Sequence, residues 1–336
     1  MKIVNYRPED YPALWEFVSR TWPERAQEYL KYRLEVLPRD SDEAAANLLV
    51  QDDCGQVVGC NLFFPSRAEI FGREETVFWS HDTMVDPRYR GDAGMELILR
   101  SNQTPGFFGA GLSETAQKIH RRLRTNFIAQ SKGYYIFNIW SCKLPFYRLG
   151  WLKSDRTKTE LSVIPDTVGA CGMVFERVRR AEQLRIPEKG YWNKGQLDID
   201  FVRDERFFRL RFFENVYPYA VFRLRAGQDD PGPDRCYFVV RRIDLKGFPA
   251  LSLVDFRYDL DRPEQFAAIL RAVAKIAFRN RLPLSVVRTT LPDKKYRLRP
   301  LTYRSERVSD VITRLKTEGT VRMLVTQADS DTDFIR

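Results

Sequence analysis

The chain of 336 residues is 43% hydrophobic and 13% aromatic, a composition that excludes a disordered protein and allows a large core. This length exceeds what one hydrophobic core usually organises, so we expect two domains. Lys and Arg number 55 against 45 Asp and Glu. The resulting net charge of +10 fits a nucleic-acid or membrane surface, a pocket for a small polyanion, or solvated arginines, and does not decide among them.

Membrane segments and metal sites are not expected. No apolar stretch approaches the roughly 18 residues of a membrane span, and the beginning, MKIVNYRPEDY, lacks the apolar run of a secretion signal. We therefore expect a cytoplasmic protein without membrane contact. The cysteines are odd in number and never closely paired, which argues against a disulfide framework and against a zinc site. They are Cys54, Cys60, Cys142, Cys171 and Cys236.

The first half of the chain predicts one α+β unit. Residues 1–9 alternate weakly as a strand, and apolar residues at helical spacing follow at 11–22. Residues 47–85 form three apolar runs separated by turn signals, which predicts an antiparallel meander. After it the pattern predicts a helix at 94–99, a strand at 106–111, a helix at 113–123 and a strand at 127–138.

The second half repeats this order after a weakly patterned stretch. The later elements are an alternating aromatic run within 205–225 read as a strand, strands at 236–241, 250–256, 284–289 and 321–326, and helices at 266–277 and 308–315. We interpret the repeat as a second copy of the same fold. The expected domains are residues 1–150 and 201–336, with an interdomain region at 151–200.

The most informative segment for function is VDPRYRGDAG, residues 85–94, between a predicted strand and a predicted helix. A loop rich in small residues at a helix start exposes backbone N–H groups, which bind phosphate oxygens together with the positive end of the helix dipole. Arg88 and Arg90 would add positive charge. The segment therefore predicts a site for a phosphate-bearing ligand.

This segment resembles the acyl-CoA-binding motif of the GNAT superfamily, V-x-P-x-x-R-G-x-G-x-G. The match rests on Val85, Pro87, Arg90 and Gly91, and it departs at Ala93 and Met95. The order of elements over roughly residues 1–140 agrees as well. The resemblance implies a bacterial tandem protein of the α+β class, with two GNAT-like (acyl-CoA N-acyltransferase) units. Each unit would have a mixed, mostly antiparallel sheet flanked by helices, and the second would lack the CoA loop.

The resemblance also implies a substrate and the residues that bind it. Acetyl-CoA or another acyl-CoA would lie with its pantetheine arm along Thr83, Met84 and Val85. Its pyrophosphate would lie on the loop and on the start of the following helix. The residues implied there are Arg88, Arg90, Gly91, Asp92, Ala93, Gly94 and Met95.

Three residues are candidates for proton transfer. By the same resemblance, His120 falls where the family has the tyrosine that protonates the departing thiolate, and an imidazole with a pKa near 6.5 can serve as that acid. Tyr147, in a YRLGW segment like the end of the same family helix, is the alternative acid. His81 is placed as a base for the acceptor amine. The structural alternatives stay open: a core or sheet-face His81 and a solvated His120.

The expected reaction is transfer of an acetyl or acyl group from acyl-CoA to the primary amine of a small acceptor by direct attack. The acceptor would be an amino sugar, an amine or an amino acid, and a homodimer is left open. Two alternatives are a catalytically inactive GNAT-fold binding or scaffold protein, supported by Ala93 and Met95, and a relative that transfers aminoacyl groups from tRNA. Other nucleic-acid binding is not expected, and the acidic end at 329–333 is read as a solvated tail.

Overall fold

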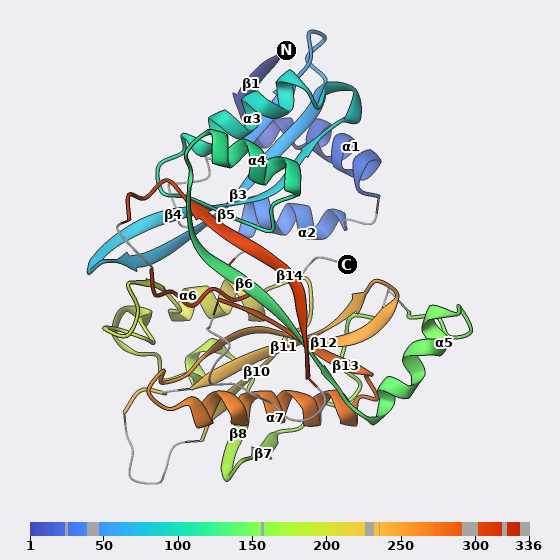
Figure 1. Cartoon of the computed structure of the whole chain (residues 1–336), viewed down its shortest axis with the longest axis vertical. Coiled ribbons are helices and arrows are strands. Elements are labelled where there is room, and N and C mark those ends of the chain that lie inside the picture. Colours follow the sequence, from blue (N-terminus) through green and yellow to red (C-terminus); the bar gives the residue numbers. More distant parts are fainter. Residues whose placement is uncertain are drawn as a thin grey trace. The chain divides into compact units, whose positions relative to one another are not determined.

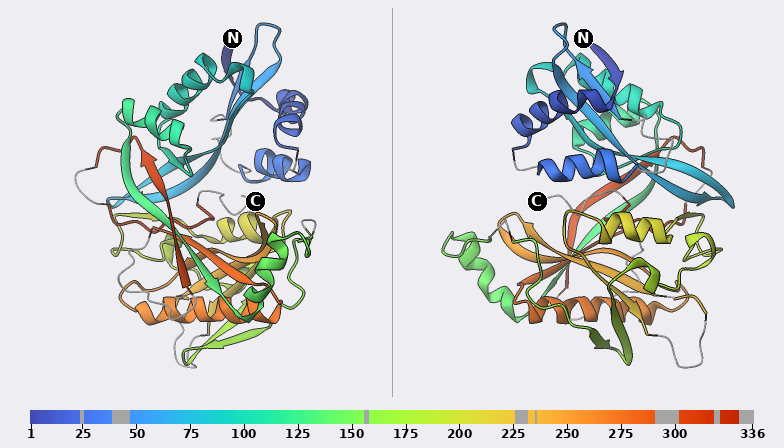
Figure 2. Two further views of the ribbon diagram at one scale, coloured as in Figure 1. Left: turned by 45° about the vertical axis from the view of Figure 1, so that its right-hand side comes forward. Right: turned by 180° about the vertical axis from the view of Figure 1, so that it is seen from behind.

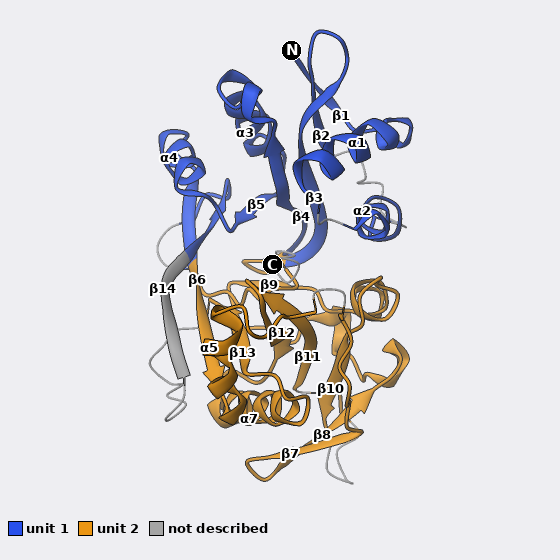
Figure 3. Cartoon of the chain, turned by 90° about the vertical axis from the view of Figure 1, so that its right-hand side faces the viewer, with its two compact units in different colours: residues 1–68, 73–129, 309–321 blue, residues 69–72, 130–308, 322–336 orange. Residues whose placement is uncertain are grey.

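A computed structural model describes residues 1–23, 26–38, 47–155, 158–225, 232–234, 236–290, 302–317 and 321–329, with the backbone alone over 302–308. The chain forms two compact units, each discontinuous in sequence (Figure 3). Unit 1 comprises residues 1–68, 73–129 and 309–321, and unit 2 comprises residues 69–72, 130–308 and 322–336. These units do not follow the boundaries expected at residues 150 and 200. Whether those boundaries delimit independently folding domains stays a prediction.

Unit 1 is a twisted sheet with helices packed on it (Figure 1). Its elements are β1 (Lys2–Asn5), α1 (Tyr11–Thr21), α2 (Gln27–Lys31), a π-helix (Tyr32–Val36), β2 (Leu48–Gln51), β3 (Val57–Ile70), β4 (Arg73–Val85), α3 (Asp92–Asn102), β5 (Phe107–Ala110) and α4 (Glu114–Arg122). The strand order is β1-β2-β3-β4-β5-β14, where β14 is Thr302–Thr313. Neighbouring strands β1, β2 and β3 are antiparallel, whereas β4 and β5 are parallel. The predicted meander and the following helices are confirmed.

Unit 2 has the same kind of mixed, mostly antiparallel sheet, with the long helix α7 lying along it (Figure 2). Its elements are α5 (Leu144–Arg148), β7 (Thr167–Ala170), β8 (Met173–Val178), β9 (Ile199–Phe201), α6 (Glu205–Phe208), a π-helix (Arg209–Phe213), β10 (Ala220–Leu224), β11 (Tyr237–Leu245), β12 (Phe248–Arg257), α7 (Pro263–Arg279) and β13 (Leu284–Thr289). The strand order is β6-β13-β12-β11-β10-β8-β7, where β6 is Asn126–Phe137. The stretch expected between domains is therefore largely part of this unit.

Helix α7 shows how periodicity produces packing. Its side chains Phe266, Ile269, Val273 and Ile276 recur every three or four residues and are at most 3% exposed, within the main core of unit 2. Each such burial contributes roughly 1.5–3 kcal/mol. The helix was predictable because a local pattern of apolar residues and its core contacts agree.

The two units repeat the same motifs, as the sequence predicts. Helix α3 joins the parallel strands β4 and β5, and helix α7 joins the parallel strands β12 and β13. A π-helix with a buried arginine precedes the meander in each unit, with Arg33 in unit 1 and Arg211 in unit 2. Residues 132–137 of β6 pair with β13 in unit 2, and residues 311–313 of β14 pair with β5 in unit 1. Each unit is thus completed by a strand from the other half of the sequence.

Three predicted elements are wrong, one of them at the end of the chain. The helix expected at 308–315 is the end of strand β14, where Val311 and Ile312 are both fully buried. A run of apolar residues that is buried throughout a strand resembles a short helix in sequence, and pairing with β5 decides between them. The strand expected within 205–225 begins instead as α6 and the π-helix, because Asp204 caps the helix by accepting the N–H of Phe207 at 2.7 Å. Residues 220–224 alone form the strand.

The end of the chain also differs from expectation. Residues 321–326 form an isolated bridge, in which Met323 pairs with Ile199, rather than a strand. Asp329 is 1% exposed, so the prediction of a solvated tail is wrong for this residue. Residues 330–333 lie outside the described residues.

Candidate functional site

Strand β4 of unit 1 extends beyond its pairing with β5. Their parallel register runs from Phe78 opposite Phe107 to Ser80 opposite Gly109, and β4 then extends through residues 81–85. Strand β5 ends at Ala110 and pairs with β14 along its other edge; just after it, the N–H of Gly111 donates to Ser309 Oγ at 2.8 Å. The main chain of 81–85 therefore continues past its parallel partner.

Alternation along β4 sets the direction of its main-chain groups. The N–H of Asp86 donates to the carbonyl of Val58 on β3 at 2.8 Å, and the carbonyl of Met84 lies against Gly59 of the same strand. The groups of Thr83 and Val85 consequently point away from β3, toward the edge of β4 that pairs with β5 only as far as Ser80. Consistent with this direction, Arg90 Nε donates to the Val85 carbonyl at 3.3 Å.

The loop after β4 leads into helix α3 without a capping side chain. A 3-10 helix spans Pro87–Tyr89, and Gly91 is the N-cap residue of α3. The first backbone bond of α3 runs from the Met95 N–H to the Gly91 carbonyl at 3.2 Å, so the N–H groups of residues 92–94 are the unpaired donors of a helix start. A Cβ added at Gly91 or at Gly94 would meet nothing within 4 Å. This is the geometry of an anion site.

Ala93 and Met95, the two residues that depart from the acyl-CoA-binding motif, have different surroundings. Ala93 is 3% exposed and packs with Val58, Leu97 and other core residues, so its methyl group points into unit 1. Met95 is 36% exposed. Neither residue needs a positive φ, because both lie within regular helix.

Two arginines flank the loop. Arg88 makes two bonds to the Asp86 carboxylate, from Nε at 3.1 Å and from Nη2 at 2.9 Å. These hydrogen bonds lower the pKa of Asp86 to about 2, so the carboxylate remains ionised and holds Arg88 at neutral pH. Arg90 is held on the Val85 carbonyl. Both guanidinium groups are therefore anchored beside the uncapped helix start.

His81 follows the last residue of β4 that pairs with β5. Its ring lies edge-on to Phe64, with centroids 6.4 Å apart, and is partly exposed. The next residue, Asp82, has φ of +45°, which is unusual for a residue with a side chain. Its carboxylate accepts from Arg33 Nη1 at 2.6 Å, an ion pair in which both side chains are largely buried. The conformation is thus fixed by a contact to the π-helix.

His120 is the one buried residue of α4. Its ring stacks on Phe107, with centroids 5.9 Å apart, and Nδ1 lies 3.3 Å from Thr125 Oγ1. Burial lowers the pKa of His120 to about 4, so the imidazole is neutral at neutral pH. The alternative of a solvated His120 is wrong, and its role in proton transfer stays a prediction.

The candidate residues are divided between the units. His81, His120 and residues 83–95 belong to unit 1. Tyr147 lies on α5 in unit 2, where its ring packs edge-on against Phe248 of β12 with centroids 6.2 Å apart. Tyr147 stays a prediction as the alternative acid.

Asn61 and Arg33 belong to no motif of the sequence and were not among the predicted site residues. Asn61 is fully buried in β3 and bonds to Ser80 and Thr83, on either side of His81 and Asp82. The one available signal was an amide inside the apolar run VVGCNLFF, since a buried polar group in such a run requires partners. For Arg33, in YLKYRLEV, the basic residue within an apolar helical pattern was a similar signal.

Comparison with solved structures identifies the fold. A GCN5-related N-acetyltransferase from Anabaena variabilis aligns over 93% of this chain and 71% of its own, with a TM-score of 0.55 and 11% identity. The chain has the GNAT fold. A probable N-acyltransferase from Enterococcus faecalis aligns over 92% of this chain and 71% of its own (TM-score 0.55, 11% identity). N-myristoyltransferase from Saccharomyces cerevisiae, solved with bound myristoyl-CoA, aligns over 93% and 78% (TM-score 0.58, 10% identity).

Sequence comparisons add nothing to this GNAT assignment, because neither a family model nor a curated protein matches the chain. Within the described ranges, no three His, Cys, Asp or Glu side chains are grouped so that they could hold a metal ion. Among the helices of the same part of the chain, none combines the length and apolar character needed to cross a membrane.

Proposed function

We propose that this protein is an acyl-CoA-dependent N-acyltransferase that moves an acetyl or acyl group to the primary amine of a small acceptor in the cytoplasm. The observation that carries the proposal is the stretch of β4 that continues past its pairing with β5, followed by the uncapped start of α3. These two features supply main-chain donors for an extended amide-bearing arm and for phosphate groups, respectively. The named neighbours, which are N-acyltransferases of the same fold, support it.

Binding would use main-chain groups first. The N–H groups of residues 92–94 would receive the pyrophosphate, with Arg88 and Arg90 adding positive charge. Thr83 and Val85 would bond to the pantetheine arm, and a main-chain N–H of this stretch would polarise the thioester carbonyl. Donors held in place before the reaction stabilise the oxyanion that develops as the amine attacks.

The chemical step is direct attack. A C–N bond forms between the amine and the thioester carbon, the C–S bond breaks, the amine loses a proton and the thiolate gains one. We place His81 as the base that receives the amine proton. His120 would protonate the thiolate: because burial lowers its pKa to about 4 and leaves it neutral in the free protein, its imidazole would first have to take up a proton, the one that the amine releases, before giving it to the sulfur.

Calorimetric titration with acetyl-CoA and with longer acyl-CoAs tests the proposal. We expect one-to-one binding, followed by thiol release when an amine from an unbiased screen is added. If neither acetyl-CoA nor longer acyl-CoAs bind, the proposal is wrong. Binding without turnover on any amine would favour the inactive scaffold, and acyl transfer that requires aminoacyl-tRNA would favour the tRNA-dependent alternative.

A further inference from the structure

A buried amide on β3 connects two elements of the candidate site, β4 and α3. Asn61 on β3 is 0% exposed, and its Oδ1 accepts from Ser80 Oγ at 3.0 Å and from Thr83 Oγ1 at 2.9 Å. Its Nδ2 donates to Ser101 Oγ on α3 at 2.5 Å. Ser101 in turn donates to the Leu97 carbonyl at 2.6 Å. One side chain therefore links β3, β4 and α3.

The bonds of Asn61 are placed around an irregular part of β4. Ser80 is the last residue of β4 that pairs with β5, and Thr83 is the first residue after Asp82 and its positive φ. With both hydroxyls on one amide oxygen, the two ends of the intervening stretch, residues 81 and 82, are held by the same side chain. Arg33, on the π-helix, holds the same stretch by donating to the Asp82 carboxylate.

Burial makes the loss of these hydrogen bonds costly in free energy. An amide that loses its partners inside a core is strongly penalised, so Asn61 favours the one arrangement of β4 that satisfies its oxygen. That arrangement also decides where the main-chain N–H of Thr83 points, because the hydroxyl and the N–H belong to the same residue. A fixed donor direction is what polarisation of a bound carbonyl requires.

We propose that Asn61 is a positioning residue for the thioester: through the hydroxyls of Ser80 and Thr83 it holds the β4 main chain in the direction needed to polarise the bound carbonyl. The inference rests on the proposed acyl-CoA function and deepens it. Asn61 itself does not contact the substrate. Its removal changes the reactivity of the bound thioester rather than the binding of the nucleotide part of coenzyme A.

Isotope-edited infrared spectroscopy tests this without a known acceptor. Acetyl-CoA carrying ¹³C at the thioester carbonyl is bound to wild type, Asn61→Leu, Thr83→Val and Thr83→Ser, and the carbonyl stretch is compared with that in solution. Calorimetry with free CoA, which has no thioester, runs in parallel. The matched control is Asn47→Leu. Asn47 is also buried, and its Oδ1 accepts at 2.7 Å from the N–H of Phe63, which lies on β3 like Asn61.

We expect a lowered carbonyl frequency in wild type that returns toward the solution value in Asn61→Leu and Thr83→Val. Thr83→Ser, which retains the hydroxyl, and Asn47→Leu should keep the wild-type frequency. Affinity for free CoA should stay within about threefold in Asn61→Leu and Asn47→Leu, whereas turnover with an amine falls by about 100-fold in Asn61→Leu, in line with loss of precise orientation.

Two results overturn the inference alone: a wild-type carbonyl frequency in Thr83→Val, or an equal loss of the frequency shift in Asn47→Leu, which would indicate a general packing effect. Thr83 is exposed, so the Thr83→Val and Thr83→Ser pair decides the matter if Asn61→Leu does not fold. Failure of the wild-type protein to bind any acyl-CoA would instead overturn the proposed function, and this inference with it.

Discussion

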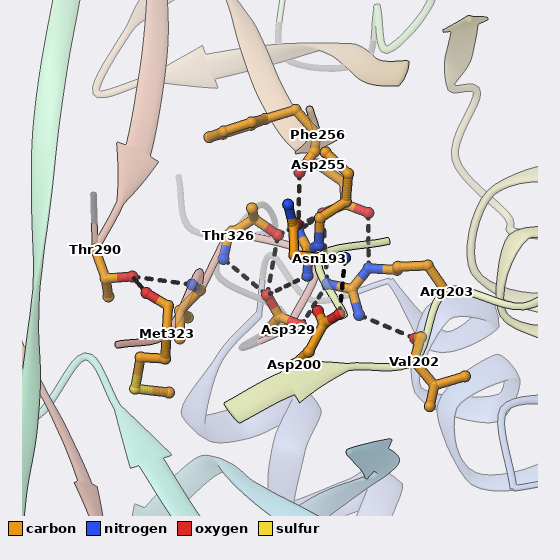
Figure 4. Close-up of polar contacts among 12 residues, drawn as sticks. Asn193, Asp200, Val202, Arg203, Asp255, Phe256, Thr290, Met323, Thr326 and Asp329 are labelled. Atoms are coloured by element: carbon orange, nitrogen blue, oxygen red, sulfur yellow. Dashed lines mark hydrogen bonds and ion pairs between the residues drawn. The ribbon is translucent and has the colours of Figure 1, made fainter. Parts of the chain in front are cut away.

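Arg203 and Asp329 form an ion pair in which neither side chain has any exposed surface (Figure 4). Arg203 also donates from Nε to Asp255 at 2.9 Å, and Asp255 accepts from Tyr237 and from Thr326. The second carboxylate oxygen of Asp329 accepts the N–H of Thr326 at 2.8 Å. A residue near the end of the chain is thereby anchored in the core of unit 2.

Removing the Asp329 carboxylate should destabilise the protein. In Asp329→Ala, Arg203 loses a buried partner and the end of the described chain loses its anchor, and breaking such a pair costs about 3–5 kcal/mol. Urea denaturation followed by tryptophan fluorescence measures the change. As a control, Asp53→Ala removes a carboxylate that is 91% exposed and paired with the N-terminal amine, and should leave stability nearly unchanged. Equal effects of the two substitutions would contradict the buried role of Asp329.

A negative charge in the first turn of α3 should weaken coenzyme A binding. Gly94 has free space around an added Cβ, so Gly94→Glu and Gly94→Gln should both fold normally. The glutamate would repel the pyrophosphate, and we expect at least about a tenfold rise in Kd, equivalent to about 1.4 kcal/mol. Glutamine has the same length without the charge and should bind more nearly as wild type does. Equal affinities of the two variants in calorimetry would place the phosphates elsewhere.

Burial of His120 should make stability depend on pH. Its pKa is lowered from 6.5 to about 4 in the folded protein, so between these values the unfolded chain binds more protons than the folded one. Stability therefore falls as pH falls through this window, with a limiting slope of about 1.4 kcal/mol per pH unit from this group. Urea denaturation at several pH values should show a shallower dependence in His120→Gln than in wild type. Identical pH dependences would mean that the imidazole titrates normally.

The acid can be assigned by comparing His120→Gln with Tyr147→Phe. If His120 protonates the thiolate, its substitution should lower kcat by about 100-fold with little change in KM, in the range typical of general acid catalysis. Phenylalanine at position 147 keeps the ring contact with Phe248 and removes only the hydroxyl, so its turnover should match wild type. The opposite pattern in a thiol-release assay would transfer the role to Tyr147.

Sequence patterns were sufficient to predict the elements whose structure depends on neighbouring residues. The apolar stripe of α7, the Ser113 cap of α4 and the loop at residues 85–94 are each contained within one element or one turn, and the structure confirms the helices and strands predicted around them. The repeated parallel pair with its connecting helix followed from the order of these local signals. No long-range contact was needed to read them.

Tertiary structure alone decided the features that depend on pairing and burial. Strand β14 is a strand because it pairs with β5, about 200 residues earlier in the chain, and the apolar residues 311–312 would fit a helix equally well. His120, Asp329 and Asn61 are polar residues that are buried against other elements of the fold, and burial is what lowers the pKa of His120. The sequence by itself determined most of the elements and predicted a phosphate site at residues 85–94. The surroundings that direct their chemistry arise only when segments far apart in the chain remove these polar groups from water.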